Sequence, residues 1–313
     1  MYLKHFGFNE FPFSLTPNLR FFCNLMAYKE AFNVIMVSLH NGEGFIKITG
    51  EVGTGKTLLC RKLLNTLGKE YVTAYISNAN LDITNLQKAI AHELEIPFPE
   101  NIDTYKLLNL LNSKLIELHR AGKHVVIIID EAHVLSDQAL EGLRLLSNLE
   151  TESSKLIQII LVGQPELDRR LKKTHLRQLA HRIVFSYRLP TISNKKELLS
   201  YIYSRLASAG YKDTYDSLFS DKAIKLLLKA SRGIPRLINV ICHKALLITY
   251  GHNKGKIDVD AIKMAIADTE SVSTAAAAPL HYYLLRIGII SLLLTSIIGA
   301  SSYFIFKLLP YVL

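Results

Sequence analysis

The segment 50–57 constrains this chain more than any other part of its sequence. It reads Gly-Glu-Val-Gly-Thr-Gly-Lys-Thr and fits the pattern G-x-x-x-x-G-K-[ST] in full. An apolar run with strand character, 45–49, precedes it, and a helical pattern, 58–67, follows it. A strand, a glycine-rich loop and a helix in this order place backbone N–H groups and a helix N-terminus around an anion. The segment therefore predicts a phosphate-binding loop.

Each residue type in this loop has a chemical task. The glycines let the backbone wrap the phosphates, the Lys56 ammonium reaches the β- and γ-phosphates, and the Thr57 hydroxyl is a ligand for Mg²⁺. The residues expected to contact the nucleotide are Gly50, Glu51, Val52, Gly53, Thr54, Gly55, Lys56, Thr57 and Leu58.

A second motif supplies the acidic half of such a site. Five apolar residues, 125–129, lead directly into Asp130 and Glu131. A buried strand would deliver Asp130 to its tip, where it holds the Mg²⁺ shell, and Glu131 would polarise the attacking water as a general base. Strand-end acids are common, but together with a complete phosphate loop they predict binding and hydrolysis of ATP with Mg²⁺.

Residues 130–133 also spell Asp-Glu-Ala-His, the DEAH box of superfamily-2 helicases. Such helicases have two RecA-like domains, a Ser-Ala-Thr motif after this strand and a late Q-x-x-G-R-x-G-R motif. Neither motif occurs in this sequence, and the pattern beyond residue 190 is helical. The helicase interpretation is therefore disfavoured.

The hydrophobic pattern divides the chain into an α/β part and a helical part. Apolar runs with strand character alternate with helical patterns at 45–49, 72–76, 125–129, 157–162 and 183–187. Near-continuous apolar runs predict a parallel sheet covered on both faces. Helices are expected at 195–209, 221–231, 235–250 and 258–268, with N-caps at Asp82 and Ser220 and with Pro235 in a first turn. We expect an α/β nucleotide-binding domain at 1–190 and a helical lid at 191–270.

The C-terminal segment has the composition of a membrane span. Residues 287–306 contain no charged side chain and, as a helix, cover about 30 Å, the thickness of a bilayer core. We expect a linker at 271–283 and a transmembrane helix with its flanks at 284–309. Because ATP is cytosolic, the N-terminal part would lie in the cytoplasm, on a single-pass protein of a bacterial inner membrane. Ser291, Thr295 and Gly299 form a small-residue stripe that either mediates helix association or is a tolerated scatter.

Charge and cysteine content limit the partners only loosely. The formal net charge of +10 permits nucleotide, nucleic acid or anionic lipid and selects none of them. The three cysteines and the histidines are scattered without metal-ligand spacing, so no structural metal is expected.

Phosphate loop, Asp-Glu strand and helical lid together resemble the AAA+ ATPases, and more closely the ExeA/GspA-type ATPases of bacterial secretion and of MSHA pilus biogenesis. The resemblance covers about residues 1–270. The matching segments are 1–8 with Pro12, Phe13 and Pro17, then 42–44, 50–57, 163–167 and 233–239. It implies an ATPase that forms an oligomer, with the nucleotide bound between protomers. The larger secretion relatives carry a periplasmic peptidoglycan-binding region that we do not expect here.

The resemblance also implies roles for single residues. Gln164 corresponds to the sensor-1 polar residue, Arg236 to the sensor-2 arginine, and Asn78 to a polar switch that holds Glu131 back. Arg182, directly before the fifth strand, corresponds to the arginine finger that completes a neighbour's site, with Arg177 as the alternative.

Three functions follow as alternatives. The leading one is a membrane-anchored AAA+ ATPase that assists assembly of a type IV pilus or secretion complex, with itself, the assembly components and membrane lipid as partners. The second is a DNA-handling ATPase of the transposition-regulator or initiator type. Nucleic acid is not an expected partner, because no winged-helix motif follows the lid. The third is a nucleotide-switched scaffold without significant turnover.

Overall fold

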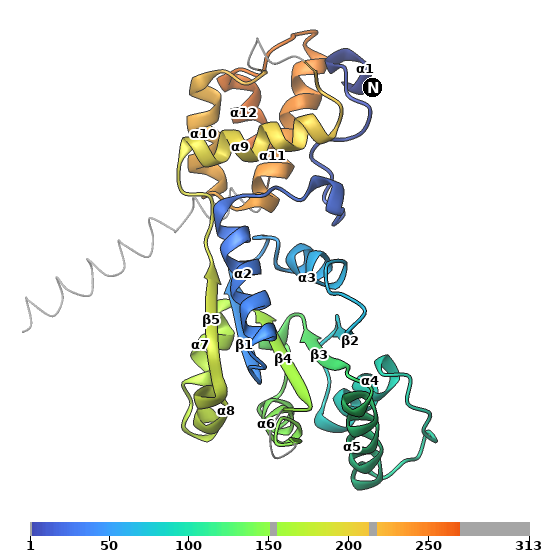
Figure 1. The fold of residues 1–313 in the computed structure, drawn as a ribbon. Helices are drawn as coiled ribbons and strands as arrows, with labels where there is room; N and C mark the ends of the chain where they lie inside the picture. Colours follow the sequence, from blue (N-terminus) through green and yellow to red (C-terminus); the bar gives the residue numbers. More distant parts are fainter. Residues whose placement is uncertain (1, 151–154, 213–217, 270–313) are drawn as a thin grey trace, which may run out of the picture. The chain divides into compact units, whose positions relative to one another are not determined.

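The computed structural model describes residues 2–150, 155–212 and 218–269. Five parallel strands form one sheet in the order β2-β3-β4-β1-β5 (Figure 1). They are β1 (Phe45–Gly50), β2 (Tyr71–Ile76), β3 (His124–Ile129), β4 (Ile157–Gly163) and β5 (Ile183–Leu189). The five expected strands and the parallel sheet are confirmed.

Burial along the strands explains this order. All seven residues of β4 are buried, and so is every residue of β3 after His124. The edge strand β5 instead alternates between exposed and partly buried residues. Strands that are buried along nearly their whole length are stable between two helical layers, and β3 and β4 accordingly occupy interior positions of the sheet.

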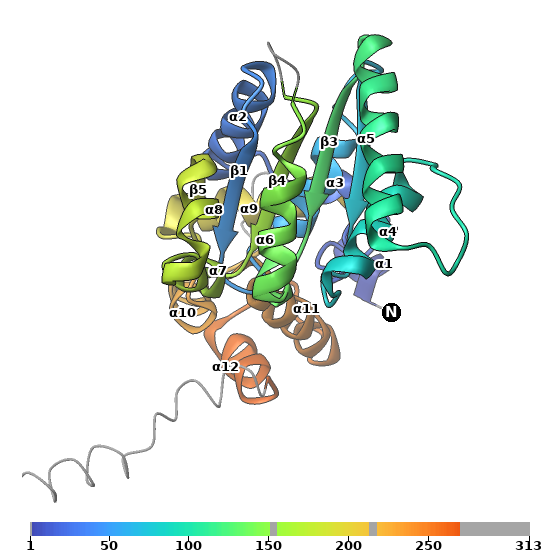
Figure 2. The same cartoon turned by 90° about the horizontal axis from the view of Figure 1, so that it is seen from below.

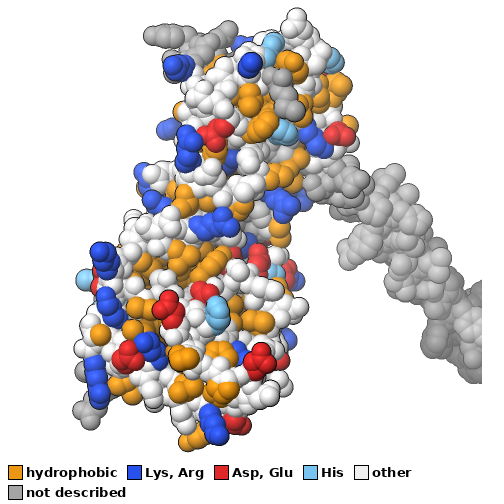
Figure 3. All heavy atoms as spheres, turned by 90° about the vertical axis from the view of Figure 1, so that its right-hand side faces the viewer, with side chains coloured by type: hydrophobic (Ala, Val, Ile, Leu, Met, Phe, Trp, Pro, Cys, Tyr) orange, Lys and Arg blue, Asp and Glu red, His pale blue; other side chains and the backbone are white. Residues whose placement is uncertain are grey.

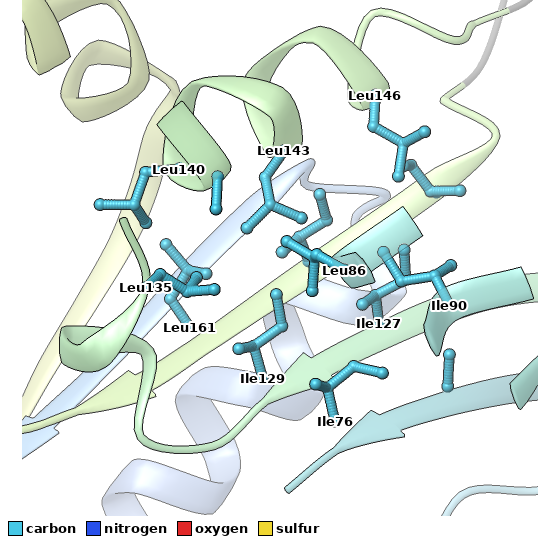
Figure 4. Close-up of a cluster of buried hydrophobic side chains, with 14 of the residues drawn as sticks. Ile76, Leu86, Ile90, Ile127, Ile129, Leu135, Leu140, Leu143, Leu146 and Leu161 are labelled. Carbon is cyan, nitrogen blue, oxygen red and sulfur yellow. The ribbon is translucent and has the colours of Figure 1, made fainter. Parts of the chain in front are cut away.

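Helices cover both faces of the sheet (Figure 2). On one face α2 and α3 pack against β1 and against each other. On the other, α4 to α8 share a hydrophobic cluster with β3 and β4; Leu86 and Ile90 of α4 meet Ile127 there (Figure 4). The bounds are α2 (Met26–His40), α3 (Lys56–Leu64), α4 (Ile83–Glu93), α5 (Thr104–Arg120), α6 (Asp137–Leu146), α7 (Pro165–Leu171) and α8 (Arg177–Arg182), with 3₁₀ helices η1 (Leu19–Phe21), η2 (Ala132–Val134) and η3 (Thr174–Leu176).

The helical part follows β5, as expected. Its elements are α9 (Lys195–Ser208), α10 (Asp221–Ser231), α11 (Pro235–Gly251) and α12 (Val259–Ala267). The caps are confirmed, since Asp82 accepts from the backbone N–H of Asn85, Ser220 accepts from that of Ala223, and Pro235 begins α11.

The N-terminal segment packs against these helices and not against the sheet. The short helix α1 (Tyr2–Phe6) lies along α11, and the Tyr2 hydroxyl is 3.0 Å from Nδ1 of His243. Tyr2 is fully buried among aromatic rings that include Phe6 and Phe8. Residues near the start of the chain therefore stabilise a helical layer formed some 200 residues later, because large aromatic side chains bury much apolar surface.

The surface shows no single-sign field on the face drawn in Figure 3. Lys and Arg side chains are interspersed with acidic and apolar ones there. Within the described ranges, no helix is long and apolar enough to cross a bilayer. The expected linker at 271–283, the span at 284–309 and the stripe from Ser291 to Gly299 lie outside the described residues.

Candidate nucleotide-binding site

The glycine-rich loop lies at the carboxyl end of β1 and runs directly into α3. Gly53 and Gly55 have φ angles of +81° and +89°, which L side chains rarely adopt. A Cβ atom at Gly53 would also lie 2.6 Å from Cβ of Arg236. Both the backbone conformation and the close approach of α11 therefore require glycine in this loop.

Lys56 is held inside the loop. The residue is only 5% exposed to solvent, and Nζ donates to the carbonyl oxygens of Gly50 (2.8 Å) and Glu51 (3.0 Å). Burial lowers the pKa of the ammonium, and the negative charges of Glu131 and Asp130 partly oppose that shift. A desolvated cation bound only to neutral carbonyls is well placed to transfer to an entering phosphate group.

Thr57 and Asp130 lie side by side at the start of α3 and the end of β3. The Thr57 hydroxyl donates to Asp130 Oδ2 (2.6 Å), and the Tyr75 hydroxyl donates to the same oxygen (3.3 Å). Asp130 is 2% exposed, and its second oxygen accepts from the backbone N–H of Glu131 (2.9 Å). A hydroxyl and a carboxylate are hard oxygen donors, the type that Mg²⁺ prefers, so these two residues fit the expected metal role.

Glu131 directs its carboxylate toward the cavity beside the loop. Its φ angle of +53° is left-handed, and its side chain remains 42% exposed. Nε2 of Gln164 lies 3.5 Å from Oε2 of Glu131, because β3 and β4 are neighbours and both residues follow the carboxyl ends of these strands. The structure therefore brings the expected base and the expected sensor-1 residue together.

Arg236 enters the site from the first turn of α11. Its backbone N–H donates to the carbonyl oxygen of Gly53 (3.2 Å), and its exposed side chain lines the same cavity as Lys56, Thr57 and Glu131. The helical part thus contacts the glycine-rich loop directly. This is the placement expected for a sensor-2 residue.

The cavity has a volume of about 380 Å³ and a second wall that the sequence did not predict. Besides the loop it is lined by the N-terminal segment 14–18, by Phe21, Phe22 and Cys23, by Tyr28, whose hydroxyl donates to the loop carbonyl of Thr54 (2.5 Å), and by Tyr201, Arg205 and Asn239 of the helical part. Phe21, Phe22 and Tyr201 give this wall aromatic surface, whereas Lys56, Glu131 and Arg236 make the loop side charged. Such a division suits a ligand with one charged and one flat apolar end.

Arg205 organises that second wall. It is 5% exposed and donates to the backbone carbonyls of Pro12 (2.7 Å) and Ser14 (3.1 Å), while its guanidinium lies 4.9 Å from the ring centroid of Phe21. The sequence did carry one signal for it, an arginine on the otherwise apolar face of α9 that holds Leu198 and Ile202. An arginine at such a position needs buried partners, and here the N-terminal segment provides them.

Asn78, Arg182 and its alternative Arg177 do not line the cavity of this chain. Arg182 precedes β5, and the first residue of β5 pairs with the first residue of β1. Arg182 therefore lies at the amino ends of the strands, whereas the loop lies at the carboxyl end of β1. Arg182 donates to Ser147 Oγ (2.7 Å). Arg177, the alternative, is exposed and donates to His181 (3.4 Å). Asn78 is exposed and accepts from the backbone N–H of Asn80 (3.2 Å). The roles of Asn78, Arg182 and Arg177 stay predictions. The side chains described beside the Glu131 carboxylate are those of Gln164 and His133.

Comparison with known proteins agrees with this geometry. Residues 39–171 match the AAA domain family. General secretion pathway protein A of Aeromonas hydrophila is 39% identical over 272 residues, which cover 87% of this chain and 49% of that protein. The chain therefore spans about half the length of this relative.

Two solved structures have the same fold at low sequence identity. Cdc6p from Pyrobaculum aerophilum matches with a TM-score of 0.62 and 19% identity, over 91% of this chain and 78% of that one. The ORC2 protein of Aeropyrum pernix, solved in ADPNP–ADP complexes, matches with a TM-score of 0.57 and 17% identity, over 80% and 72%. Together with the loop and the Asp-Glu strand, the comparisons identify the chain as a P-loop AAA protein related to the ExeA/GspA-type AAA+ ATPases.

Proposed function

We propose that this chain is an ATPase that binds ATP with Mg²⁺ in the cavity between the glycine-rich loop and the N-terminal segment. The observation that carries the proposal is that Lys56, Thr57 and Glu131 line one cavity, and that Thr57 donates to the buried carboxylate of Asp130 behind it. These are the groups that phosphoryl transfer to water requires, namely a cation for the phosphates, two metal ligands and a base.

Each group has a distinct part in hydrolysis. Lys56 would exchange its carbonyl partners for phosphate oxygens, and Arg236 would add positive charge from the helical part. Mg²⁺ held by Thr57 and Asp130 would neutralise charge on the phosphates. Glu131 would accept a proton from the attacking water, with Gln164 orienting the same carboxylate. Fixed charges in a desolvated site stabilise the transition state without reorganisation.

The test separates binding from chemistry in one residue. Glu131→Gln keeps the shape and hydrogen-bonding capacity of the side chain and removes the base. We expect ATP affinity to change little and turnover to fall by about 10²-fold or more. Steady-state phosphate release and titration with a fluorescent ATP analogue measure the two quantities. Unchanged turnover would contradict general-base catalysis at Glu131, and absence of turnover in the wild-type protein would support a nucleotide-switched scaffold.

The cellular role is proposed from the sequence and the relative together. We propose a membrane-anchored oligomer that assists assembly of a type IV pilus or secretion complex, held by residues 284–309 in a bacterial inner membrane with its ATP sites in the cytoplasm. The name of the Aeromonas hydrophila relative, General secretion pathway protein A, supports the link to secretion. The uncharged run 287–306 supports the anchor.

Affinity capture tests this role. The Glu131→Gln chain, loaded with ATP and extracted from membranes in mild detergent, should retain its partners, because slow turnover keeps the nucleotide-bound state populated. Recovery of pilus or secretion components, absent with Lys56→Ala, is the expected result. If none were recovered, the assembly role would be contradicted while the ATPase proposal stood.

A further inference from the structure

The carboxylate of Glu131 has a second neighbour besides Gln164. Nδ1 of His133 lies 3.2 Å from Oε2 of Glu131, the same oxygen that Gln164 approaches. The His133 side chain is only 15% exposed, and its Nδ1 atom is buried without an aligned hydrogen-bond partner. Glu131 is the left-handed N-cap of η2 and His133 lies within η2, so the imidazole beside the carboxylate can restrict where the carboxylate lies.

The turn that carries both residues is fastened to α7 by a single arginine. Nη1 of Arg170 donates to the carbonyl oxygen of His133 (2.7 Å), and its Nε and Nη2 atoms donate to Oδ1 of Asp137, the first residue of α6. The Arg170 guanidinium, and then His175, hold the pKa of Asp137 well below its usual range. One guanidinium thus bridges α6, η2 and α7.

Helix α7 is in turn fixed to the strand that carries the phosphate loop. Asp168 accepts from the ammonium of Lys47 and from the hydroxyl of Thr49 (3.0 Å), both on β1. Gln164 is the N-cap of α7, and Arg170 lies in its last turn. Both groups that reach the Glu131 turn therefore come from one helix whose position is set relative to the loop.

Packing leaves this turn little freedom. Ala132 and Leu135 are fully buried, and a Cβ atom at Gly163 would lie 3.2 Å from the backbone nitrogen of His133. With its backbone pinned by Arg170, the remaining freedom of the turn is the Glu131 side chain itself. His133 and Gln164 limit that freedom from two directions.

We propose that His133 and Arg170 are positioning residues for Glu131, His133 by restraining the carboxylate and Arg170 by fixing the turn. The inference rests on the proposed ATPase function. A base must lie within hydrogen-bond reach of the attacking water, and a displacement of about 1 Å can cost 10²-fold in rate. Neither residue contacts the phosphate loop, so their effect falls on turnover and not on ATP binding.

The first test compares turnover with affinity. Arg170→Met keeps the volume of the stem and removes the donors, and His133→Phe keeps a ring and removes Nδ1. Each should lower kcat by about 10- to 100-fold and leave ATP affinity within about twofold, because Lys56 and Thr57 are untouched. Lys173→Met is the matched control, since Lys173 also pairs with Asp137 (3.1 Å) and has no described contact with the turn.

The second test asks whether both residues act through Glu131. In a Glu131→Gln background, single-turnover rates should show no further loss from Arg170→Met or His133→Phe, because the group they position is gone. Equal fold losses in both backgrounds, or an unchanged kcat in the single variants, would overturn the inference. Wild-type protein without turnover would overturn the proposed function as well. A thermal unfolding curve that shows each variant folded at the assay temperature excludes a loss of fold as the cause, and a lowered midpoint is expected for Arg170→Met because it removes the main partner of Asp137.

Discussion

The hydroxyl of Thr57 lies 2.6 Å from Oδ2 of Asp130, although the two residues are 73 positions apart in the sequence. Thr57 follows β1 and Asp130 follows β3, and β4 lies between these strands in the sheet. The carboxyl ends of parallel strands converge on one edge, so the glycine-rich loop and the strand-end acid form one site.

Removing the loop ammonium should abolish nucleotide binding. We expect Lys56→Ala to weaken ATP affinity by about 10²-fold or more, because the phosphate charge would then be poorly neutralised in a desolvated cleft. Titration with a fluorescent ATP analogue measures the effect. Lys62→Ala, an exposed lysine of the same helix, is the control and should bind as wild type. Wild-type affinity in Lys56→Ala would contradict the assignment of this loop.

Substitutions in the second cavity wall, at Arg205 and Phe21, should weaken binding of the nucleoside part of ATP and leave binding of its phosphates unchanged. Arg205→Met removes the donors that hold the backbone of Pro12 and Ser14 and the cation above Phe21. We expect ATP affinity to fall by about tenfold, the loss of one such buried contact of 1–2 kcal/mol.

Inorganic tripolyphosphate separates the two ends of the cavity. Its affinity should be unchanged in Arg205→Met, because it needs only the loop. Phe21→Leu should show the same split without removing a buried charge, and Lys225→Met, an exposed lysine of α10, should change neither ligand. Equal losses for ATP and tripolyphosphate would mean that Arg205 supports the whole fold.

Asp137, which pairs with Arg170, Lys173 and His175, should make the free energy of unfolding depend on pH through its carboxyl group. Its pKa is depressed in the folded state, so the ionised carboxylate stabilises the fold above its unfolded pKa of about 3.9, and this contribution is lost as pH falls through the folded pKa. Asp137→Asn should therefore lower the urea midpoint at about pH 7, and its difference from wild type should shrink steadily in strong acid. A difference that is constant with pH would exclude the ionised pair as its cause.

We predict that Arg182 completes the site of a neighbouring protomer, because it lies at the amino ends of the strands, away from its own loop. Arg182→Ala and Glu131→Gln protomers should each be defective alone and partly active when mixed, since each supplies the group that the other lacks. Turnover should peak at intermediate ratios. If mixing restored nothing while assembly remained intact, a finger in trans at this position would be wrong, and Arg177→Ala would be tested in the same way.

The proposed C-terminal anchor can be tested by fractionation. The full chain should sediment with membranes at ordinary salt, and deletion of residues 281–313 should yield a soluble protein with wild-type ATP affinity. Replacing Thr295 and Gly299 with leucine should weaken self-association without releasing the protein, if the small residues let helices approach closely. A full-length chain in the soluble fraction would contradict the membrane span.

Local sequence determined the elements of this protein. Apolar β-rich runs specified the strands within one or two residues, and Asp82, Ser220 and Pro235 marked helix starts, because caps and proline act on neighbouring backbone groups. The sequence of residues 50–57 predicted the phosphate loop equally well. Gly53 and Gly55 are needed for positive φ angles, a constraint that acts within the loop itself.

Only the tertiary structure decided which residues share the cavity. The strand order set Gln164 beside Glu131. Asn78 accepts from the backbone of Asn80 and Arg182 precedes β5, where it donates to Ser147, so neither lines the cavity of this chain. The roles of His133 and Arg205 were hidden for the same reason. Each depends on partners far away in sequence, Arg170 on α7 and the N-terminal backbone at Pro12. A buried polar group must find hydrogen-bond partners, but its sequence neighbours do not reveal which part of the folded chain supplies them.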